Sequence, residues 1–193
     1  MEKTSIEILE SFAKERGINY TTNSYVKDFS LNHSERFISS KFIVFNLNSI
    51  NKDLFFVFYD SFSPKAYASL TYSGLFKKIS ECYNEIKITK RYWFDLRKKL
   101  KSNDSYIDRK VTIIGDNDKI DRRIVNSGVI RSYIEIQELF PTLELETIRK
   151  SESIVPELTG NNFVAIKTNS WILEEKKLEL LIKEGSKIFA EIN

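Results

Sequence analysis

Hydrophobic and polar positions near the N-terminus follow the spacing of a helix. Ile8 and Phe12 lie four residues apart in the stretch "IEILESFA", and their apolar neighbours complete one stripe. Thr4 and Glu7 fit a capping box, in which each side chain bonds the backbone amide of the other residue. Gly17 stands where such a helix would stop. The pattern predicts a capped helix that ends before Gly17.

A second helical pattern occupies the C-terminal residues. The stretch 168–175, "TNSWILEE", is typical of a helix start, with Asn169 or Ser170 as the N-cap and Trp171 at the junction between helix and sheet. The residues that follow predict a long amphipathic helix with one apolar face. Its apolar positions are Leu178, Leu181, Ile182, Gly185, Ile188, Phe189 and Ile192.

Strand patterns fill much of the chain between these helices. The runs 41–48, "KFIVFNLN", and 53–60, "DLFFVFYD", are rich in Val, Ile and Phe. The short polar linker 49–52 between them predicts an antiparallel hairpin. Shorter strand candidates are 18–22, 66–72, 85–88, 109–115, 142–148 and 163–168.

Two further segments follow helical spacing. In 74–86, the residues Leu75, Phe76, Ile79 and Tyr83 share a face of a predicted helix. The segment 116–140 predicts one or two helices, interrupted near Ser127–Gly128 and ended by Pro141.

Together these elements predict an α+β fold with a mixed, mainly antiparallel sheet covered by helices and a long C-terminal amphipathic helix. The 193 residues are expected to form a single domain, 1–193, with a subdomain boundary near 101–106, where the polar run "KSNDSY" breaks the pattern.

Composition narrows the classes of site. The chain has one cysteine, Cys82, and one histidine, His33, which excludes an intramolecular disulfide and a Cys/His zinc site. The N-terminal residues are charged and periodic, unlike a signal peptide, and the longest apolar run is too short to span a bilayer. These features predict a cytoplasmic protein without a membrane partner.

Charge is concentrated in the segment 87–101, "KITKRYWFDLRKKLK". Seven basic residues and one acidic residue give it a charge of +6, whereas the whole chain carries +3, so the remainder sums to −3. With Thr89 as N-cap, the segment predicts a helix from Lys90 to Lys101. Its buried side would hold Tyr92, Trp93, Leu96 and Leu100.

The opposite side of that predicted helix is the candidate binding surface. The favoured interpretation is a structural helix with a solvated basic face. The alternative is a nucleic-acid surface, on which Phe94 stacks on a base and the cations meet phosphates. The candidate residues are Lys90, Arg91, Phe94, Arg97, Lys98 and Lys101.

Two groups of acidic residues raise the question of a metal site. Asp116, Asp118 and Asp121 follow a strand candidate, but a turn in which Asp118 caps the next helix explains them better than Mg²⁺ or Ca²⁺ ligands do. Asp60, followed later by Glu85 and Lys87, is similar to the core of metal-dependent nucleases, although Glu-x-Lys arises easily in a chain with 30% charged residues.

No signature of catalysis accompanies these groups. The chain lacks a glycine-rich phosphate loop and a nucleophile elbow, and its single histidine offers no evident triad. The sequence therefore predicts a non-catalytic binding or adaptor protein without a cofactor, acting on a protein partner. A nucleic-acid-binding module that uses residues 87–101 is the first alternative, and a metal-dependent nuclease is the second.

Overall fold

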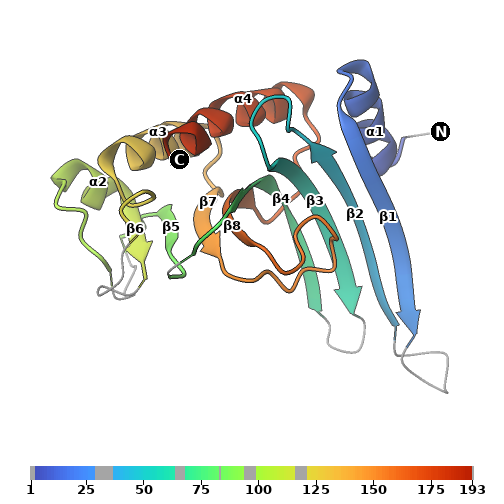
Figure 1. The fold of residues 1–193 in the computed structure, drawn as a ribbon, viewed down its shortest axis with the longest axis horizontal. Coiled ribbons are helices and arrows are strands. Elements are labelled where there is room, and N and C mark those ends of the chain that lie inside the picture. The colour runs from blue at the N-terminus through green and yellow to red at the C-terminus, as the bar shows by residue number, and fades with distance from the viewer. Residues whose placement is uncertain are drawn as a thin grey trace.

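An eight-stranded sheet forms the centre of the molecule (Figure 1). The computed structural model describes residues 3–28, 37–63, 68–82, 84–93, 99–115 and 121–192. Every strand pairing found in these residues is antiparallel, in the order β1-β2-β3-β4-β8-β7-β5-β6. The strands are β1 (Asn19–Asp28), β2 (Phe37–Asn46), β3 (Leu54–Ser63), β4 (Ala68–Ile79), β5 (Lys87–Lys90), β6 (Val111–Ile114), β7 (Glu144–Ile148) and β8 (Asn162–Thr168). The helices are α1 (Ser5–Glu15), α2 (Ser105–Lys110), α3 (Ser127–Leu139) and α4 (Glu175–Glu191).

The N-terminal helix forms as its sequence predicts. The Thr4 hydroxyl accepts a hydrogen bond from the Glu7 amide at 3.3 Å, and the Glu7 carboxylate accepts one from the Thr4 amide at 2.7 Å. Gly17 follows with a positive φ of 62°, a conformation that glycine adopts without strain. The predicted capping box and helix stop are both confirmed.

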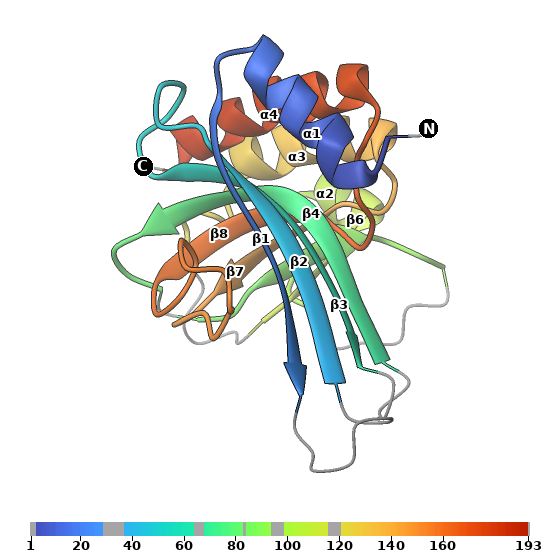
Figure 2. The ribbon, with the colours of Figure 1, turned by 90° about the vertical axis from the view of Figure 1, so that its right-hand side faces the viewer.

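The first four strands form an antiparallel meander. The predicted hairpin is confirmed as β2 and β3, and both strands are longer than their apolar runs. Figure 2 shows these strands extending well past the helices at one end of the sheet. Strand periodicity places successive side chains on opposite faces, so Phe56 and Phe58 face the helices while Val57 and Tyr59 face away.

The predicted helix in 74–86 is wrong, because β4 continues as a strand to Ile79. Leu75 packs in the core under the helices, whereas Phe76 packs on the opposite face. The strand is paired on both sides, with β3 and β8, which satisfies its backbone without a helix. A β-carbon at Gly74 would collide with the carbonyl oxygen of Ile166 on β8, so glycine permits this pairing. Tyr83 lies outside the described residues.

The chain from residue 101 onward forms α2, β6 and α3 in turn. The polar run 101–106 leads into α2, whose N-cap Asp104 accepts a hydrogen bond from the Tyr106 amide at 2.9 Å. Strands from both sides of this run join the same sheet. Helix α3 begins only at Ser127, where the sequence predicted an interruption, and residues 121–126 form turns.

Helices cover one face of the sheet, with α4 lying along it beside α1 and α3 (Figure 1). All seven predicted apolar positions of α4 are buried, which confirms the amphipathic helix. This helix starts at Glu175, so the predicted caps Asn169 and Ser170 are wrong. The Trp171 indole donates a hydrogen bond to the carbonyl of Tyr59 at 2.9 Å and thereby joins the segment before α4 to β3.

The other face of the sheet has no helix over it among the described residues. The loop 149–161 lies there instead, and its side chains Val155 and Leu158 pack on Phe76 and Phe163. The predicted α+β class and C-terminal helix are therefore confirmed, while the helical cover is smaller than expected. None of the described helices is long and apolar enough to cross a membrane.

Candidate nucleic-acid interface

The basic segment, residues 87–101, begins as a strand and not as the predicted helix. Residues Lys87–Lys90 form β5, which pairs with β6 and β7, and Thr89 is a buried strand residue rather than an N-cap. The isoleucine at 88 is fully buried between neighbouring strands and the helices, which fixes this stretch in the sheet. The helix start at Lys90 is therefore wrong. Phe94, Leu96, Arg97 and Lys98 lie outside the described residues.

The two aromatics after β5 are exposed, contrary to the prediction that they are buried. Tyr92 is 46% exposed and Trp93 is 95% exposed. Leu100 is buried in the core as predicted, and its amide donates to the carbonyl of Ile113 of β6 at 2.9 Å. Sheet pairing thus anchors both ends of the exposed segment.

Helix α2 lies beside the exposed pair of aromatics. The Arg91 amide donates to the carbonyl of Lys110 at 2.9 Å, and the Arg91 guanidinium donates to the carbonyl of Asp108. Tyr106 of α2 presents a third partly exposed ring. The Arg131 guanidinium lies 5.2 Å from the centre of that ring and the Lys110 ammonium 5.9 Å from it.

We call this part of the molecule the basic–aromatic end. Its cations outnumber its carboxylates by seven to four, which is a local charge of +3. Figure 1 shows its elements β5, β6 and α2 together at one end of the long axis. The described residues concerned are the cations Lys90, Arg91, Lys99, Lys101, Arg109, Lys110 and Arg131, the aromatics Tyr92, Trp93 and Tyr106, and the acids Asp104, Asp108, Glu135 and Glu138.

Three of the four carboxylates have a partner close by. Asp104 accepts from Arg131 at 2.7 Å, and this bond lowers the pKa of Asp104, with help from the amides that it caps. Glu138 pairs with Lys110 at 3.0 Å, which raises the pKa of Lys110. Asp108 accepts from the amide and the hydroxyl of Ser102 at 2.9 and 2.8 Å.

Three lysines of the basic–aromatic end remain without such a partner. Among the residues that the structure describes, no carboxylate forms an ion pair with Lys90, Lys99 or Lys101. Lys90 and Lys101 are exposed and Lys99 is partly exposed, so the excess positive charge at this end is open to solvent. The chemistry available here is attraction of a polyanion together with stacking on an aromatic surface.

Sequence reasoning found some of these residues and missed others. Lys90, Arg91 and Lys101 were predicted binding residues, and the structure places them at the basic–aromatic end. Tyr106, Arg109, Lys110 and Arg131 were missed because they come from elements that lie close only in the folded chain. One local signal was available: Asp104 as an N-cap before "SYIDRK" predicts the short helix that carries Tyr106 and Lys110 on one face.

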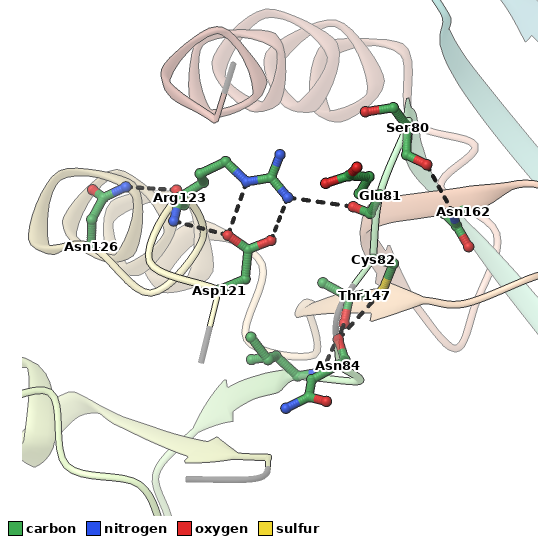
Figure 3. Close-up of polar contacts among 10 residues, drawn as sticks. Ser80, Glu81, Cys82, Asn84, Asp121, Arg123, Asn126, Thr147 and Asn162 are labelled. Carbon is green, nitrogen blue, oxygen red and sulfur yellow. Dashed lines mark hydrogen bonds and ion pairs between the residues drawn. The ribbon is translucent and has the colours of Figure 1, made fainter. Parts of the chain in front are cut away.

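The aspartate triplet offers one described member, Asp121, which has a structural role. Its carboxylate accepts from the Arg123 guanidinium at 2.6 and 3.0 Å and from the Arg123 amide at 3.1 Å (Figure 3). These bonds lower the pKa of Asp121 although the side chain is buried. Arg123 also reaches the carbonyl of Glu81 at 3.4 Å, so the pair ties the turn before α3 to the segment that follows β4. Asp116 and Asp118 lie outside the described residues.

The second acidic group does not come together. Asp60 lies on β3 and bonds Thr71 and Lys41 at 2.7 and 3.5 Å. Lys87 lies on β5 and pairs with Glu144 at 2.7 Å. Strands β4, β8 and β7 separate β3 from β5, so Asp60 is remote from Glu85 and Lys87. Within the described residues, no three side chains among His, Cys, Asp and Glu converge as metal ligands.

The single cysteine does not form a reactive thiolate site. Its thiol donates to the carbonyl of Asn84 at 3.4 Å beside Thr147 (Figure 3), and burial raises the pKa of Cys82. His33, the only histidine, lies outside the described residues.

Comparisons with models of protein families, with curated proteins and with solved structures give no significant match. The function of this chain is therefore inferred from its residues and their geometry.

Proposed function

We propose that the protein is a non-catalytic binding protein whose basic–aromatic end binds single-stranded nucleic acid. The observation that carries this proposal is the 95% exposure of Trp93 next to Tyr92, Lys90 and Arg91. A large aromatic side chain on the surface keeps apolar area in contact with water, and stacking on a base would remove it.

Exposed aromatic rings beside lysines favour the binding of single-stranded nucleic acid over that of a duplex. Unpaired bases offer a face to an aromatic ring, whereas bases within a duplex are already stacked on one another. Reading a major groove needs an inserted helix or ribbon, and α2 has only six residues. Lys90, Lys99 and Lys101 supply phosphate contacts around the stacking ring.

This proposal adopts the first alternative of the sequence analysis, a nucleic-acid-binding module, in place of the protein partner that the sequence favoured. The sequence-based preference rested on the absence of catalytic signatures and on the frequency of solvated basic helix faces, and Phe94 was the ring expected to stack in the alternative. The exposure of both rings places stacking groups among the cations. RNA and DNA share this chemistry, so the experiment includes both.

Fluorescence anisotropy with labelled oligouridylate and oligothymidylate of about twelve nucleotides tests the proposal directly. Trp93→Ala should weaken binding by roughly 5- to 150-fold, because a stacked base contributes about 1–3 kcal/mol. The double substitution Lys90→Glu/Arg91→Glu should weaken binding further and flatten its salt dependence. Phe62→Ala, which removes an exposed ring of β3, and Lys183→Glu on α4 are the matched controls.

Tryptophan fluorescence gives a second readout, because the chain has only two tryptophans. In a Trp171→Phe variant the emission comes from Trp93 alone, and stacking on a base should quench it upon titration. Binding that is equal for duplex and single strand, or that is unchanged by Trp93→Ala, would contradict the proposal. So would titrations that show no binding at low salt.

A further inference from the structure

The two edges of the eight-stranded sheet, formed by β1 and β6, differ in length and in cover. Strand β6 has only four residues, and its Ile113 pairs with Ile88 of β5 on one side and with Leu100 on the other. Strand β1 has ten residues and, in the described part of the chain, pairs only with β2. Figure 1 shows β1 as the outermost strand at its end of the sheet. Its outward-pointing amides and carbonyls therefore form a template on which a further strand can pair.

The sequence of β1 lacks the features that usually protect the edge of a sheet. Lysine, proline and bulges on an edge strand oppose pairing with another chain. Residues 19–26, "NYTTNSYV", contain no proline and no charged residue, and the only charges of the strand are Lys27 and Asp28 at its end. The register with β2 is continuous over all ten residues, so no bulge bends this edge away. The edge is thus long, regular and mostly neutral.

The middle of β1 is accessible from both faces of the sheet. Residues 21–24 are all exposed, although their side chains alternate between the two faces. Helix α1 lies near the beginning of the strand, where Ile18 and Tyr20 are partly buried against the core. Figure 2 shows β1 continuing well past α1. A second strand can therefore approach the middle of β1 without meeting a helix of this chain.

From these features we infer that β1 pairs antiparallel with β1 of a second copy of the chain, about a two-fold axis that passes at Thr22 or Asn23. A two-fold axis perpendicular to a sheet makes the same strand of two copies antiparallel, as in every strand pairing described for this sheet. Residues directly opposite each other point to the same face, so the residue at the axis lies opposite its own copy. This inference stands apart from the proposed nucleic-acid surface.

The composition of β1 suits pairing with its own copy. A symmetric contact brings the same strand together twice, so charges near the axis would repel their own copies. With the axis at Thr22 or Asn23, Lys27 and Asp28 lie opposite residues 16–19 and remain remote from their own copies. The residues around the axis are threonine, asparagine and serine, and Thr–Thr and Thr–Ser pairs across strands form hydrogen bonds.

This pairing is complete with two copies. It uses the β1 edge of both, and the β6 edges that remain are short and partly covered by Leu100. Pairing of β1 with β6 of another copy would instead continue without closing. Because β5 and β6 lie at the opposite edge from β1, the dimer would carry its two basic–aromatic ends far apart, on its outer sides.

Sedimentation equilibrium of the full chain over roughly 1–200 µM should show reversible association to twice the mass of 22.6 kDa. Thr22→Lys/Asn23→Lys places like charges at the axis in either register and should weaken dimerisation at least about tenfold. Glu135→Lys raises the net charge by the same amount at an exposed position on α3, remote from β1, and should leave dimerisation unchanged.

A charge swap separates loss of pairing from loss of folding. Thr22→Glu/Asn23→Glu should also be monomeric alone, because it brings four carboxylates together at the axis. A mixture of the lysine variant and the glutamate variant should form a heterodimer, which two misfolded chains would not do.

Cysteine crosslinking tests the register. In a Cys82→Ser background, either Thr22→Cys or Asn23→Cys should form a disulfide-linked dimer with oxidised glutathione, because the residue at the axis lies within disulfide reach of its copy. Glu135→Cys, at an exposed position on α3, is the matched control and should crosslink much less.

The inference is overturned by a chain that stays monomeric at about 200 µM, or by a dimer that the lysine variant leaves intact. Assemblies that grow beyond two copies, or equal crosslinking of Glu135→Cys, would overturn it as well. Trp93→Ala should not change dimerisation, so failure here is distinguishable from failure of the nucleic-acid proposal.

Discussion

Aromatic residues have opposite environments in two regions of this molecule. In the β1–β4 region they form a core, where Phe58 packs against Phe56 and Phe45 at ring-centre distances of 4.7 and 5.4 Å. All three are fully buried. At the basic–aromatic end, Tyr92 and Trp93 lie on the surface among cations.

The difference shows that position between the sheet and the elements packed on it, rather than residue type, decides whether an aromatic residue is buried here. Strands β2 and β3 are long and have neighbours on both sides, so alternate residues face the helices along most of each strand. Strand β5 has only four residues and ends at Lys90. Tyr92 and Trp93 come after its last paired residue, so the sheet does not direct them to the core.

Aromatic residues also pack on the face of the β3–β4 region that lies away from the helices. Tyr72 stacks on Tyr59 at 5.1 Å, beneath the loop 149–161. Burial raises the pKa of Tyr72 to about 12. Tyr72 is thus partly buried even though no described helix lies above it.

The largest expected effect on the free energy of unfolding is in the buried aromatic core of the β1–β4 region. Phe58→Ala should lower the free energy of unfolding by about 3–5 kcal/mol, because it removes a fully buried ring and leaves a cavity among its neighbours. Urea denaturation followed by circular dichroism measures the change. A loss below about 1 kcal/mol would show that the aromatic cluster is not the core of this region.

Tyr133 sharpens the comparison, because it is a fully buried aromatic residue on α3, outside the β1–β4 region. Its hydroxyl donates toward the carbonyls of Leu143 and Ile88 at 2.7 and 3.0 Å, and it accepts from Gln137 at 2.6 Å. Tyr133→Phe should cost about 1–3 kcal/mol, since it leaves buried polar groups with fewer partners. The urea midpoint measures this, and Tyr106→Phe on the surface serves as control. An unchanged midpoint in Tyr133→Phe would argue against a structural role for these bonds.

Asp121 tests the polar contacts that hold the turn before α3. Because the pKa of Asp121 is lowered in the folded state, its stabilising effect is present above the ordinary aspartate pKa and is lost as the pH falls through the lowered value. Asp121→Asn should therefore cost about 1 kcal/mol at neutral pH, with partly exposed Arg123 limiting the size of the loss.

Urea midpoints measured at pH 7 and at about pH 3 check this dependence. The difference between Asp121→Asn and the natural chain should shrink on acidification. A difference that stays constant or grows would contradict the ion pair as its cause.

The smallest effect on stability is expected at Trp93. Trp93→Ala should change the free energy of unfolding by no more than about 0.5 kcal/mol, because its side chain is almost fully exposed. Thermal unfolding monitored by far-ultraviolet circular dichroism measures it. A loss as large as that of Phe58→Ala would mean that Trp93 belongs to the core and would remove the main support for the proposed function.

The sequence predicted elements well where local signals were sufficient. The capping box at Thr4, the stripe on α4 and the alternation in β7 all depend on neighbours within a few residues. It failed at 74–86 because Leu75, Phe76 and Ile79 fit a helical face and a strand equally well over so short a run. Pairing of β4 with the distant β8 favours the strand.

The candidate binding site was predicted only in part, for the same reason. Lys90, Arg91 and Lys101 stand out in the sequence as members of a charged run. Arg131 is 40 residues from Arg91, and only the packing of α3 beside α2 brings it to the same end. Helical periodicity over 90–101 predicted that Tyr92 and Trp93 are buried. That periodicity takes no account of a strand that ends at Lys90.

The sequence by itself determined the ends of α1, the apolar face of α4, the β2–β3 hairpin and the concentration of positive charge, because each depends on residues close together in the chain. Tertiary structure alone decided the position of β8 between β4 and β7, the exposure of Trp93 and the position of β1 at the edge of the sheet. The physical reason is that strand pairing and side-chain burial depend on partners supplied from far along the chain.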